Sequence, residues 1–306
     1  CAAIKLVTEQ LNQKYHMQPE LHFAVIALGK LGMQELMIGS DLDVMFLYDI
    51  PYSADLSDAD ALTLHQYYNR LTARVINLLS QPSKMGALYE MDTKLRPYGA
   101  QGAVAVRLDG FTDYYASAAW IVENLALLQA RVVYASDAMQ QPAANALARA
   151  QLILEPPSKI SKNIHEIRKK ISEQYYSSNA WDIKYVWGGM MDLQWILKGL
   201  LAKYSARHPL PEHFGDTVGH IHWLQQIHAI DENQQQMLLE AHRIFHTVLS
   251  YLRLCHGNAL KEENITDGLK EMLTDVTGMK DYKSLKQHLL RLQAQIYHMY
   301  QNLSYL

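Results

Sequence analysis

Several residue types are scarce in this sequence, and each shortage excludes a class of protein. The chain has 306 residues but only 2 cysteines, Cys1 and Cys255, which lie far apart. Two distant cysteines cannot form the disulfide framework of a small secreted protein, so we expect a cytoplasmic location. Long hydrophobic runs are also missing, because none approaches the roughly 18 residues that a membrane-spanning helix needs. We therefore expect no membrane partner.

No excess of charge of one sign is present either. The 28 Lys and Arg residues nearly balance the 31 Asp and Glu residues, which gives a formal net charge of -3. A protein without a basic field attracts nucleic acid weakly, so we expect no nucleic-acid partner. Hydrophobic residues, by contrast, make up 49% of the chain, and its length is sufficient for the cores of two domains.

The beginning of the chain shows no signal peptide. Residues 1–17 have instead the apolar spacing of an amphipathic helix, and this pattern is already under way at residue 1, without an initiator methionine. We therefore expect the sequence to be part of a longer protein.

The segment most informative about function is Gly39-Ser40-Asp41-Leu42-Asp43, which continues directly into the apolar residues 44–48. A short apolar run that is rich in β-forming residues predicts a buried strand. Asp41 and Asp43 stand at its entrance, and on an extended backbone both carboxylates point to one face, about 7 Å apart at Cα. Two such acids repel each other unless a cation lies between them, and Mg²⁺ prefers carboxylates combined with substrate phosphates. The segment therefore predicts a magnesium site.

A second strand is predicted at residues 22–28, and it runs into the turn Gly29-Lys30-Leu31-Gly32. Glycines let the backbone N–H groups of such a turn approach an anion, and Lys30 adds positive charge. Asp41 follows shortly afterwards in the chain. Together, the turn and the carboxylates indicate a site for a phosphate group.

A third carboxylate is available from residues 87–95, which also have the pattern of a strand. Glu90 and Asp92 are two residues apart and share one face, so spacing alone does not choose between them. Arg96 follows just beyond, where it serves either a triphosphate or a structural ion pair. Residues 103–108 alternate like a further strand.

From about residue 110 onward the sequence has the apolar spacing of helices, several of them separated by proline or glycine. Asp192, just after Gly188-Gly189, is typical of the first turn of a helix. The expected helices cover residues 59–80 and then 110–118, 121–134, 137–150, 158–176, 189–205, 216–228, 231–256, 262–275 and 281–302. We predict an α+β fold, in which a small mixed-sheet domain at 1–115 precedes a large all-α domain at 116–306.

These motifs resemble the nucleotidyltransferase domain of the glutamine synthetase adenylyltransferase family, part of the DNA polymerase beta-like nucleotidyltransferase superfamily. The similarity starts with residues 29–36 and 39–43. It continues through Leu88-Tyr89-Glu90-Met91-Asp92 with Leu95-Arg96-Pro97, through residues 123–133, and through Trp181-Asp182-Ile183-Lys184 with Gly188-Gly189 and Asp192. The motifs cover roughly residues 22–200 in the family's order.

The resemblance implies a nucleotidyltransferase that moves AMP from ATP to a tyrosine of glutamine synthetase with two Mg²⁺ ions, and so regulates nitrogen metabolism. It implies Asp41, Asp43 and Asp92 as catalytic and metal-binding residues, because the family's third acid precedes Leu-Arg-Pro as Asp92 does. The nucleotide-binding residues that it implies are Gly29, Lys30, Ser40, Arg96, Lys184 and Asp192. A PII-type nitrogen signalling protein is the implied regulatory partner.

Two alternatives remain for the activity. The family enzyme also has an N-terminal half that removes AMP by phosphorolysis, although residues 88–92 and 130–134 are more similar to the attaching, C-terminal half. The other alternative is a regulatory module with weakened catalysis. It is motivated by four positions that depart from the usual family residues, namely Val122, Asn124, Gln129 and Gln194.

Overall fold

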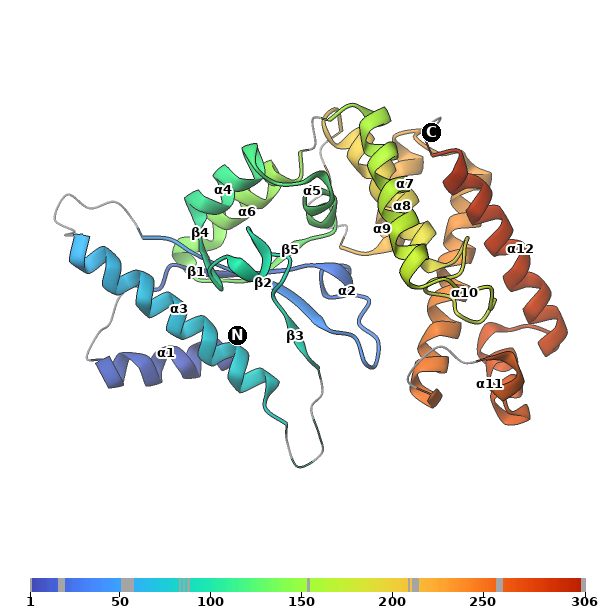
Figure 1. Ribbon diagram of the computed structural model, residues 1–306, viewed down its shortest axis with the longest axis horizontal. Coiled ribbons are helices and arrows are strands. Elements are labelled where there is room, and N and C mark those ends of the chain that lie inside the picture. The colour runs from blue at the N-terminus through green and yellow to red at the C-terminus, as the bar shows by residue number, and fades with distance from the viewer. Residues whose placement is uncertain are drawn as a thin grey trace. The chain divides into compact units, whose positions relative to one another are not determined.

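The computed structural model describes residues 2–15, 20–50, 58–82, 84, 86, 89–152, 155–208, 210, 215–256 and 261–303. Its contacts divide the chain into two compact units (Figure 1). The first consists of Cys1–Leu36 and Ser40–Leu152, and the second of Met37–Gly39 and Ile153–Leu306. The expected boundary at residue 115 falls inside the first unit, because a strand and a helix that follow it complete the sheet and one of its cores.

A mixed sheet with five strands in the described residues forms the centre of the first unit. β1 (Phe23–Ala27) lies between β2 (Leu42–Tyr48) and β5 (Arg131–Ala135) and runs antiparallel to both. Two short strands, β3 (Met91–Asp92) and β4 (Ala105–Arg107), run parallel to β2. Because β1 occupies one edge of β2, β3 and β4 follow each other along the opposite edge.

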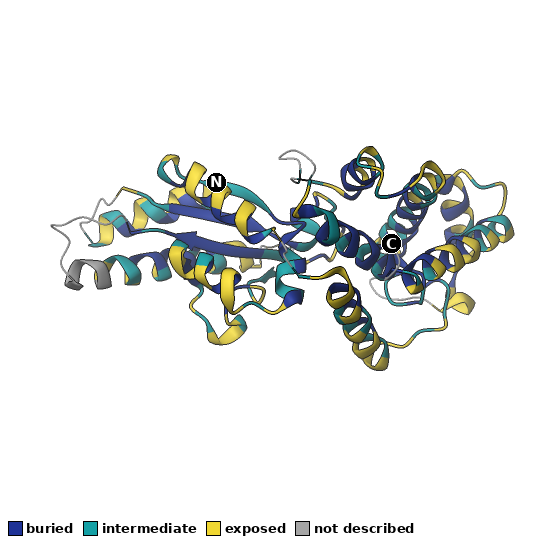
Figure 2. Ribbon diagram, turned by 90° about the horizontal axis from the view of Figure 1, so that it is seen from above, coloured by how far each residue is buried: buried dark blue, intermediate teal, exposed yellow. Residues whose placement is uncertain are grey.

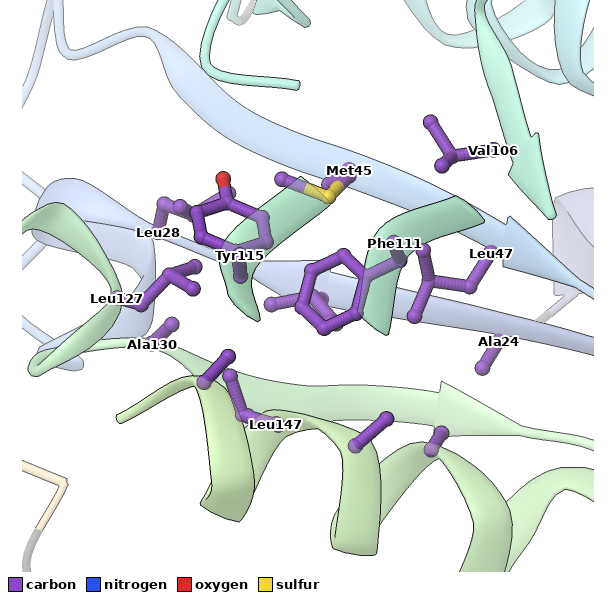
Figure 3. Close-up of a cluster of buried hydrophobic side chains, with 14 of the residues drawn as sticks. Ala24, Leu28, Met45, Leu47, Val106, Phe111, Tyr115, Leu127, Ala130 and Leu147 are labelled. Carbon is purple, nitrogen blue, oxygen red and sulfur yellow. The ribbon is translucent and has the colours of Figure 1, made fainter. Parts of the chain in front are cut away.

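Side chains of the buried strands alternate between two faces, as the period of an extended chain requires. Met45 and its alternate neighbour Leu47 enter the core on one face of the sheet. Helices α4 (Leu108–Ser117), α5 (Ile121–Leu127) and α6 (Gln140–Ala150) cover that face. Figure 3 shows aromatic rings of α4 packed among the strand residues of this core.

The opposite face of the sheet carries a second core. Phe46 of β2 stacks there on Phe23 of β1, with ring centroids 5.9 Å apart. Helices α1 (Ala2–Tyr15) and α3 (Asp58–Ser80) cover this face. Figure 2 shows the buried strands beside helices whose outer sides are exposed. Both faces of the sheet are therefore occupied by packing, and polar residues are left to the strand ends.

The regular secondary structure of the second unit consists of helices in the part that the structure describes. Three of its helices have side-chain caps, because Asp216, Thr266 and Asp281 each accept a hydrogen bond from a backbone N–H three residues later. The helices are α7 (Pro157–Gln174), α8 (Met190–Ser205), α9 (Thr217–Gln226), α10 (Glu232–His256), α11 (Asp267–Thr277) and α12 (Tyr282–Gln301). One short helical turn, η3 (Glu262–Asn264), also belongs to the second unit, whereas the turns α2 (Gly29–Gly32), η1 (Gly99–Gln101) and η2 (Asp137–Met139) belong to the first.

The α+β fold class is confirmed, but two predicted elements differ from the structure. The expected helix over 121–134 is wrong in its last part, where residues 131–135 form β5. The sequence of β5, Arg-Val-Val-Tyr-Ala, is rich in β-branched residues, and β1 offers it an edge with hydrogen-bond partners. The expected strand over 87–95 is confined to β3, while residues 87 and 88 lie outside the described residues.

None of the helices that the structure describes is long and apolar enough to cross a membrane. Cys255 is an exposed free thiol. Cys1, and residues 16 and 17 at the end of the first expected helix, lie outside the described residues.

Candidate active site

The pairing of β2 with β3 determines which acids of the candidate site are neighbours. Asp43 lies opposite Asp92 in this parallel pair. Neighbouring strands are about 4.8 Å apart and paired residues share one face, so the two side chains start side by side. Asp41 comes one strand period earlier, about 7 Å along the chain. Spacing alone does not choose between Glu90 and Asp92, whereas the register makes Asp92 the neighbour of Asp43.

Glu90 stands at the other end of the same pairing. Its carbonyl oxygen accepts a hydrogen bond of 2.7 Å from the N–H of Leu42, so Glu90 is level with Asp41. The side chains of Asp41 and Glu90 are both exposed. The entrance of β2 therefore carries two rows of acids, the outer one formed by Asp41 and Glu90 and the inner one by Asp43 and Asp92.

Local hydrogen bonds orient the Asp92 carboxylate. The backbone N–H of Lys94 donates to Oδ1 over 2.8 Å, and the Lys94 ammonium lies 3.3 Å from Oδ2. The Asp92 side chain is 26% exposed and the Lys94 side chain 78% exposed. An ion pair this open to water is worth about 0–1 kcal/mol, so a divalent ion is able to displace the ammonium.

The Asp43 carboxylate lies against the turn that follows β1. The N–H of Leu28 donates to the Asp43 carbonyl oxygen over 2.9 Å, which joins the end of β1 to the beginning of β2. Gly29 follows with a left-handed φ of +51°, and a Cβ atom built on it would lie 2.3 Å from Asp43 Oδ2. The carboxylate therefore occupies space that any residue other than glycine would fill.

The α2 turn is fixed on its other side by β5. Arg131 Nε donates to the carbonyl oxygen of Gly32 over 3.0 Å, and its Nη2 donates to that of Leu31 over 3.2 Å. The expected tight turn is thus one turn of helix with its carbonyls held from outside. Lys30 in this turn is partly buried, and Ser40, just before Asp41, is buried.

Arg96 is placed inside its own loop. Its guanidinium donates to the carbonyl oxygens of Thr93 at 2.7 Å and Gly102 at 3.0 Å, and the residue is only 6% exposed. A guanidinium with five donors suits such a set of carbonyls. In the structure Arg96 therefore shapes the loop that follows Asp92, and its contact with a triphosphate stays a prediction.

The positions that depart from the family are found in and beyond α5. Glu123 accepts hydrogen bonds from the backbone N–H of Trp120, over 2.8 Å, and from the Tyr114 hydroxyl. Burial raises the pKa of Tyr114, and the neighbouring Glu123 carboxylate, as the second cause, raises it further. The departures Val122 and Asn124 are partly buried beside Glu123, whereas Gln194 lies in α8. The side-chain nitrogen of Gln129 is buried without a hydrogen-bond partner among the described residues.

Two predicted nucleotide-binding residues belong to the second unit. Asp192 is in the first turn of α8, as expected, and its carboxylate is fully buried. It accepts hydrogen bonds of 2.5 Å from Arg168 Nε and from the N–H of Gly188. Burial raises the pKa of Asp192, and Arg168 opposes this shift. Asp192 is therefore a structural partner of Arg168 here, and a role in nucleotide binding stays a prediction.

Lys184 is partly buried in the second unit and lies beside a tyrosine. Its ammonium lies 4.7 Å from the ring centroid of Tyr185. Tyr185 in turn stacks on Tyr175, with centroids 4.8 Å apart. The Tyr185 carbonyl oxygen accepts a hydrogen bond of 2.8 Å from Arg168 Nη2, so the buried ion pair also holds this segment.

Sequence reasoning missed three supporting residues, Lys94, Arg131 and Arg168. The role of Arg131 is not visible in the local sequence, because the carbonyl oxygens to which it donates belong to residues 99 and 100 positions earlier in the chain. Arg168 stands among several lysines of α7, and its burial against Asp192 has no signal in the local sequence. Only Lys94 had a local sequence signal, because a cation two residues after an acid is able to fold back onto that acid.

The residues at the entrance of β2 suit a magnesium ion. Within the described part of the chain, no three His, Cys, Asp or Glu side chains form a ready metal cage. Mg²⁺ does not need such a cage, because it is usually held by one or two carboxylates together with phosphates and water. Asp43 and Asp92, paired in register, provide those carboxylates, with Asp41 nearby.

Comparisons with known proteins extend this description. Residues 2–146 match the family model described as glutamate-ammonia ligase adenylyltransferase. The chain is 31% identical over 293 residues to a bifunctional glutamine synthetase adenylyltransferase/adenylyl-removing enzyme of Rhodopseudomonas palustris strain BisB5, covering 95% of this chain and 29% of that protein. A protein of the same description from Brucella suis biovar 1 is 32% identical over 297 residues, covering 94% and 29%. The chain thus spans less than a third of the length of these relatives.

Proposed function

We propose, on the premise that residues 2–146 match the family model of glutamate-ammonia ligase adenylyltransferase, that the first unit transfers AMP from ATP to a tyrosine of glutamine synthetase. The register of β2 and β3 carries the proposal, because it sets Asp43 beside Asp92. Two neighbouring carboxylates, with Asp41 one strand period away, are a suitable ligand set for metal-assisted transfer of a nucleotidyl group.

The reaction is an in-line displacement at the α-phosphorus of ATP. The tyrosine oxygen forms the new O–P bond, the bond from the α-phosphorus to the bridging oxygen breaks, and pyrophosphate leaves. Little covalent work falls to the protein, so its contribution is to position the reactants and to stabilise charge. Bound Mg²⁺ supplies neutralisation of the phosphate charges.

Within this proposal, Asp41, Asp43 and Asp92 hold the two metal ions. The hydroxyl of a tyrosine has a pKa near about 10, so it is protonated at neutral pH and must lose its proton to react. We assign the Asp92 carboxylate as the acceptor, since hydrogen bonds orient it. Lys30 and Ser40 are assigned to the phosphates on the strength of the family resemblance.

The adenylyl-removing reaction is the second candidate, because the printed names of the relatives contain both activities. It uses the same carboxylates but takes inorganic phosphate, which attacks the phosphorus of AMP-tyrosine. The bond from that phosphorus to the tyrosine oxygen breaks, so ADP and the unmodified tyrosine are released. We further propose a cytoplasmic location and a PII-type signalling protein as the regulatory partner of the longer enzyme.

The test is incubation of the protein with glutamine synthetase, Mg²⁺ and ATP labelled at the α-phosphate. We expect label on glutamine synthetase and release of pyrophosphate. The matched variants are Asp43→Asn, which should be inactive, and Asp113→Asn on the exposed side of α4, which should retain activity. A parallel reaction supplies phosphate and adenylylated glutamine synthetase, and ADP release there without attachment would establish the removing reaction instead.

A further inference from the structure

Gly29 lies directly against the carboxylate of Asp43. Its absent Cβ would lie 2.3 Å from Oδ2 and 3.2 Å from Cγ of Asp43. Elsewhere, the closest atoms to such a Cβ belong to the backbone, as at Gly32 and Gly102, or to leucine at Gly199, or the space is open, as at Gly278. At none of these other positions is a carboxylate the nearest group, whereas at Gly29 it is.

The backbone on both sides of this contact is held in place. Asp43 belongs to β2, whose next residue, Val44, pairs with Ala27 at the end of β1. The Gly29 carbonyl oxygen accepts a hydrogen bond of 3.0 Å from the N–H of Met33. Because hydrogen bonds hold the backbone at both Gly29 and Asp43, a methyl group at position 29 would have to be accommodated by rotation of the Asp43 carboxylate.

We propose that Gly29 is a positioning residue for Asp43, in that the missing side chain leaves the space in which the Asp43 carboxylate is oriented. This inference rests on the proposed function, since it matters for catalysis only if Asp43 holds a metal ion. It gives Gly29 a role different from the phosphate contact that the resemblance implies. Gly29 acts through Asp43 and does not touch the substrate.

A double-mutant cycle in thermal stability tests the contact itself without metal or substrate. Asp43→Ala removes Cγ and both oxygens and leaves a Cβ at 3.6 Å, an ordinary contact distance. Gly29→Ala should therefore lower the unfolding temperature about twice as much in the wild-type chain as in the Asp43→Ala chain. Equal losses in the two backgrounds would overturn the inference.

Gly278→Ala is the matched control for backbone strain. Gly278 has a φ of +71° and nothing within 4 Å of its absent Cβ, so its substitution reports the cost of the left-handed conformation alone. In the Asp43→Ala background, Gly29→Ala should cost about as much as Gly278→Ala. If Gly29→Ala alone fails to fold, restoration of folding by Asp43→Ala supports the contact, and absence of restoration contradicts it.

Titration with Mn²⁺ alone, followed by electron paramagnetic resonance, separates this inference from the proposed function. We expect Gly29→Ala to weaken Mn²⁺ binding about tenfold or more, as Asp43→Asn does, and Gly278→Ala to leave it unchanged. Wild-type affinity in Asp43→Asn would refute the metal role and with it the proposed function. Loss in Asp43→Asn together with wild-type affinity in Gly29→Ala would refute only the inference.

Steady-state kinetics of AMP transfer measure kcat and the KM for ATP separately, and their pattern distinguishes a positioning role from a purely structural one. A misplaced Asp43 should lower kcat while the KM for ATP stays within about twofold, because the triphosphate contacts remain. A raised KM with unchanged kcat would instead indicate that Gly29 contacts the phosphates directly, and would overturn the positioning role.

Discussion

Asp43 was expected to bind a metal ion and Asp192 to bind the nucleotide, and the structure gives these two acids opposite surroundings. Asp192 is fully buried, and its oxygens accept hydrogen bonds from Arg168 and Gly188. Asp43 is the second residue of β2 and lies directly opposite another acid, Asp92. An acid that is buried against an opposite charge supports the fold. Acids that lie side by side repel each other, and a bound cation would remove that repulsion.

The largest expected effect comes from breaking the buried pair. Asp192→Asn keeps the shape but leaves the Arg168 charge uncompensated, so we expect a loss of about 3–5 kcal/mol in the free energy of unfolding. Urea denaturation followed by tryptophan fluorescence measures it, because Trp181, Trp187 and Trp195 lie in the same unit. Asp275→Asn, at an exposed position of α11, is the control, and an equal loss in both would contradict the account.

Burial also governs how the second unit responds to pH. Burial lowers the pKa of His220 from 6.5 to about 4, so the folded chain holds the neutral ring. The unfolded chain takes up the proton first, and stability that is complete above about pH 6.5 falls as the pH drops toward 4, at up to about 1.4 kcal/mol per pH unit. Between pH 6.5 and 5, His220→Gln should flatten the slope of unfolding free energy against pH. Identical slopes would show that His220 is protonated alike in both states.

At the entrance of β2, replacement of an aspartate by asparagine should not lower the stability of the fold, in contrast to the same replacement at Asp192. Asp43→Asn removes repulsion between neighbouring acids, so we expect unchanged stability or a gain of up to about 1 kcal/mol in the absence of divalent ions. Thermal unfolding in a chelating buffer, with Asp113→Asn alongside, provides the measurement. A clear loss of stability would mean that Asp43 resembles Asp192 and supports the fold.

The smallest expected effect concerns Lys94. Its ammonium competes with a metal ion for Asp92, but the pair is exposed and therefore weak. Lys94→Gln should tighten Mn²⁺ binding by less than about fivefold and leave stability within about 0.5 kcal/mol. Weaker Mn²⁺ binding in this variant would show instead that Lys94 orients the carboxylate for the metal.

The sequence was sufficient for the elements that local pattern determines. The apolar run at 44–48 predicts β2, and the alternation of an extended chain places Asp41 and Asp43 on one face. The choice of Asp92 over Glu90 depends on the register between two strands far apart in the chain, which periodicity does not contain. Only the family resemblance indicated Asp92 as the third carboxylate beforehand.

Other features were beyond local pattern because their partners are distant. The run at 131–135 fits a helix or a strand by periodicity, and the edge of β1 decides for a strand. Arg168 meets Asp192 across 24 positions, so neither burial nor pairing is visible in the spacing of α7. Arg96 reaches the carbonyl oxygen of Gly102 only once the turn at 99–102 has formed.

The central claim is that Asp43 and Asp92 act together in AMP transfer, and a comparison of Asp92→Asn with Glu90→Gln tests it most directly. Both substitutions remove one charge from the same short segment while keeping the shape of the side chain. With α-labelled ATP, Mg²⁺ and glutamine synthetase, we expect Asp92→Asn to lower the transfer rate by about 100-fold to 1,000-fold or more, and Glu90→Gln to retain most of it. An active Asp92→Asn beside an inactive Glu90→Gln would contradict the account.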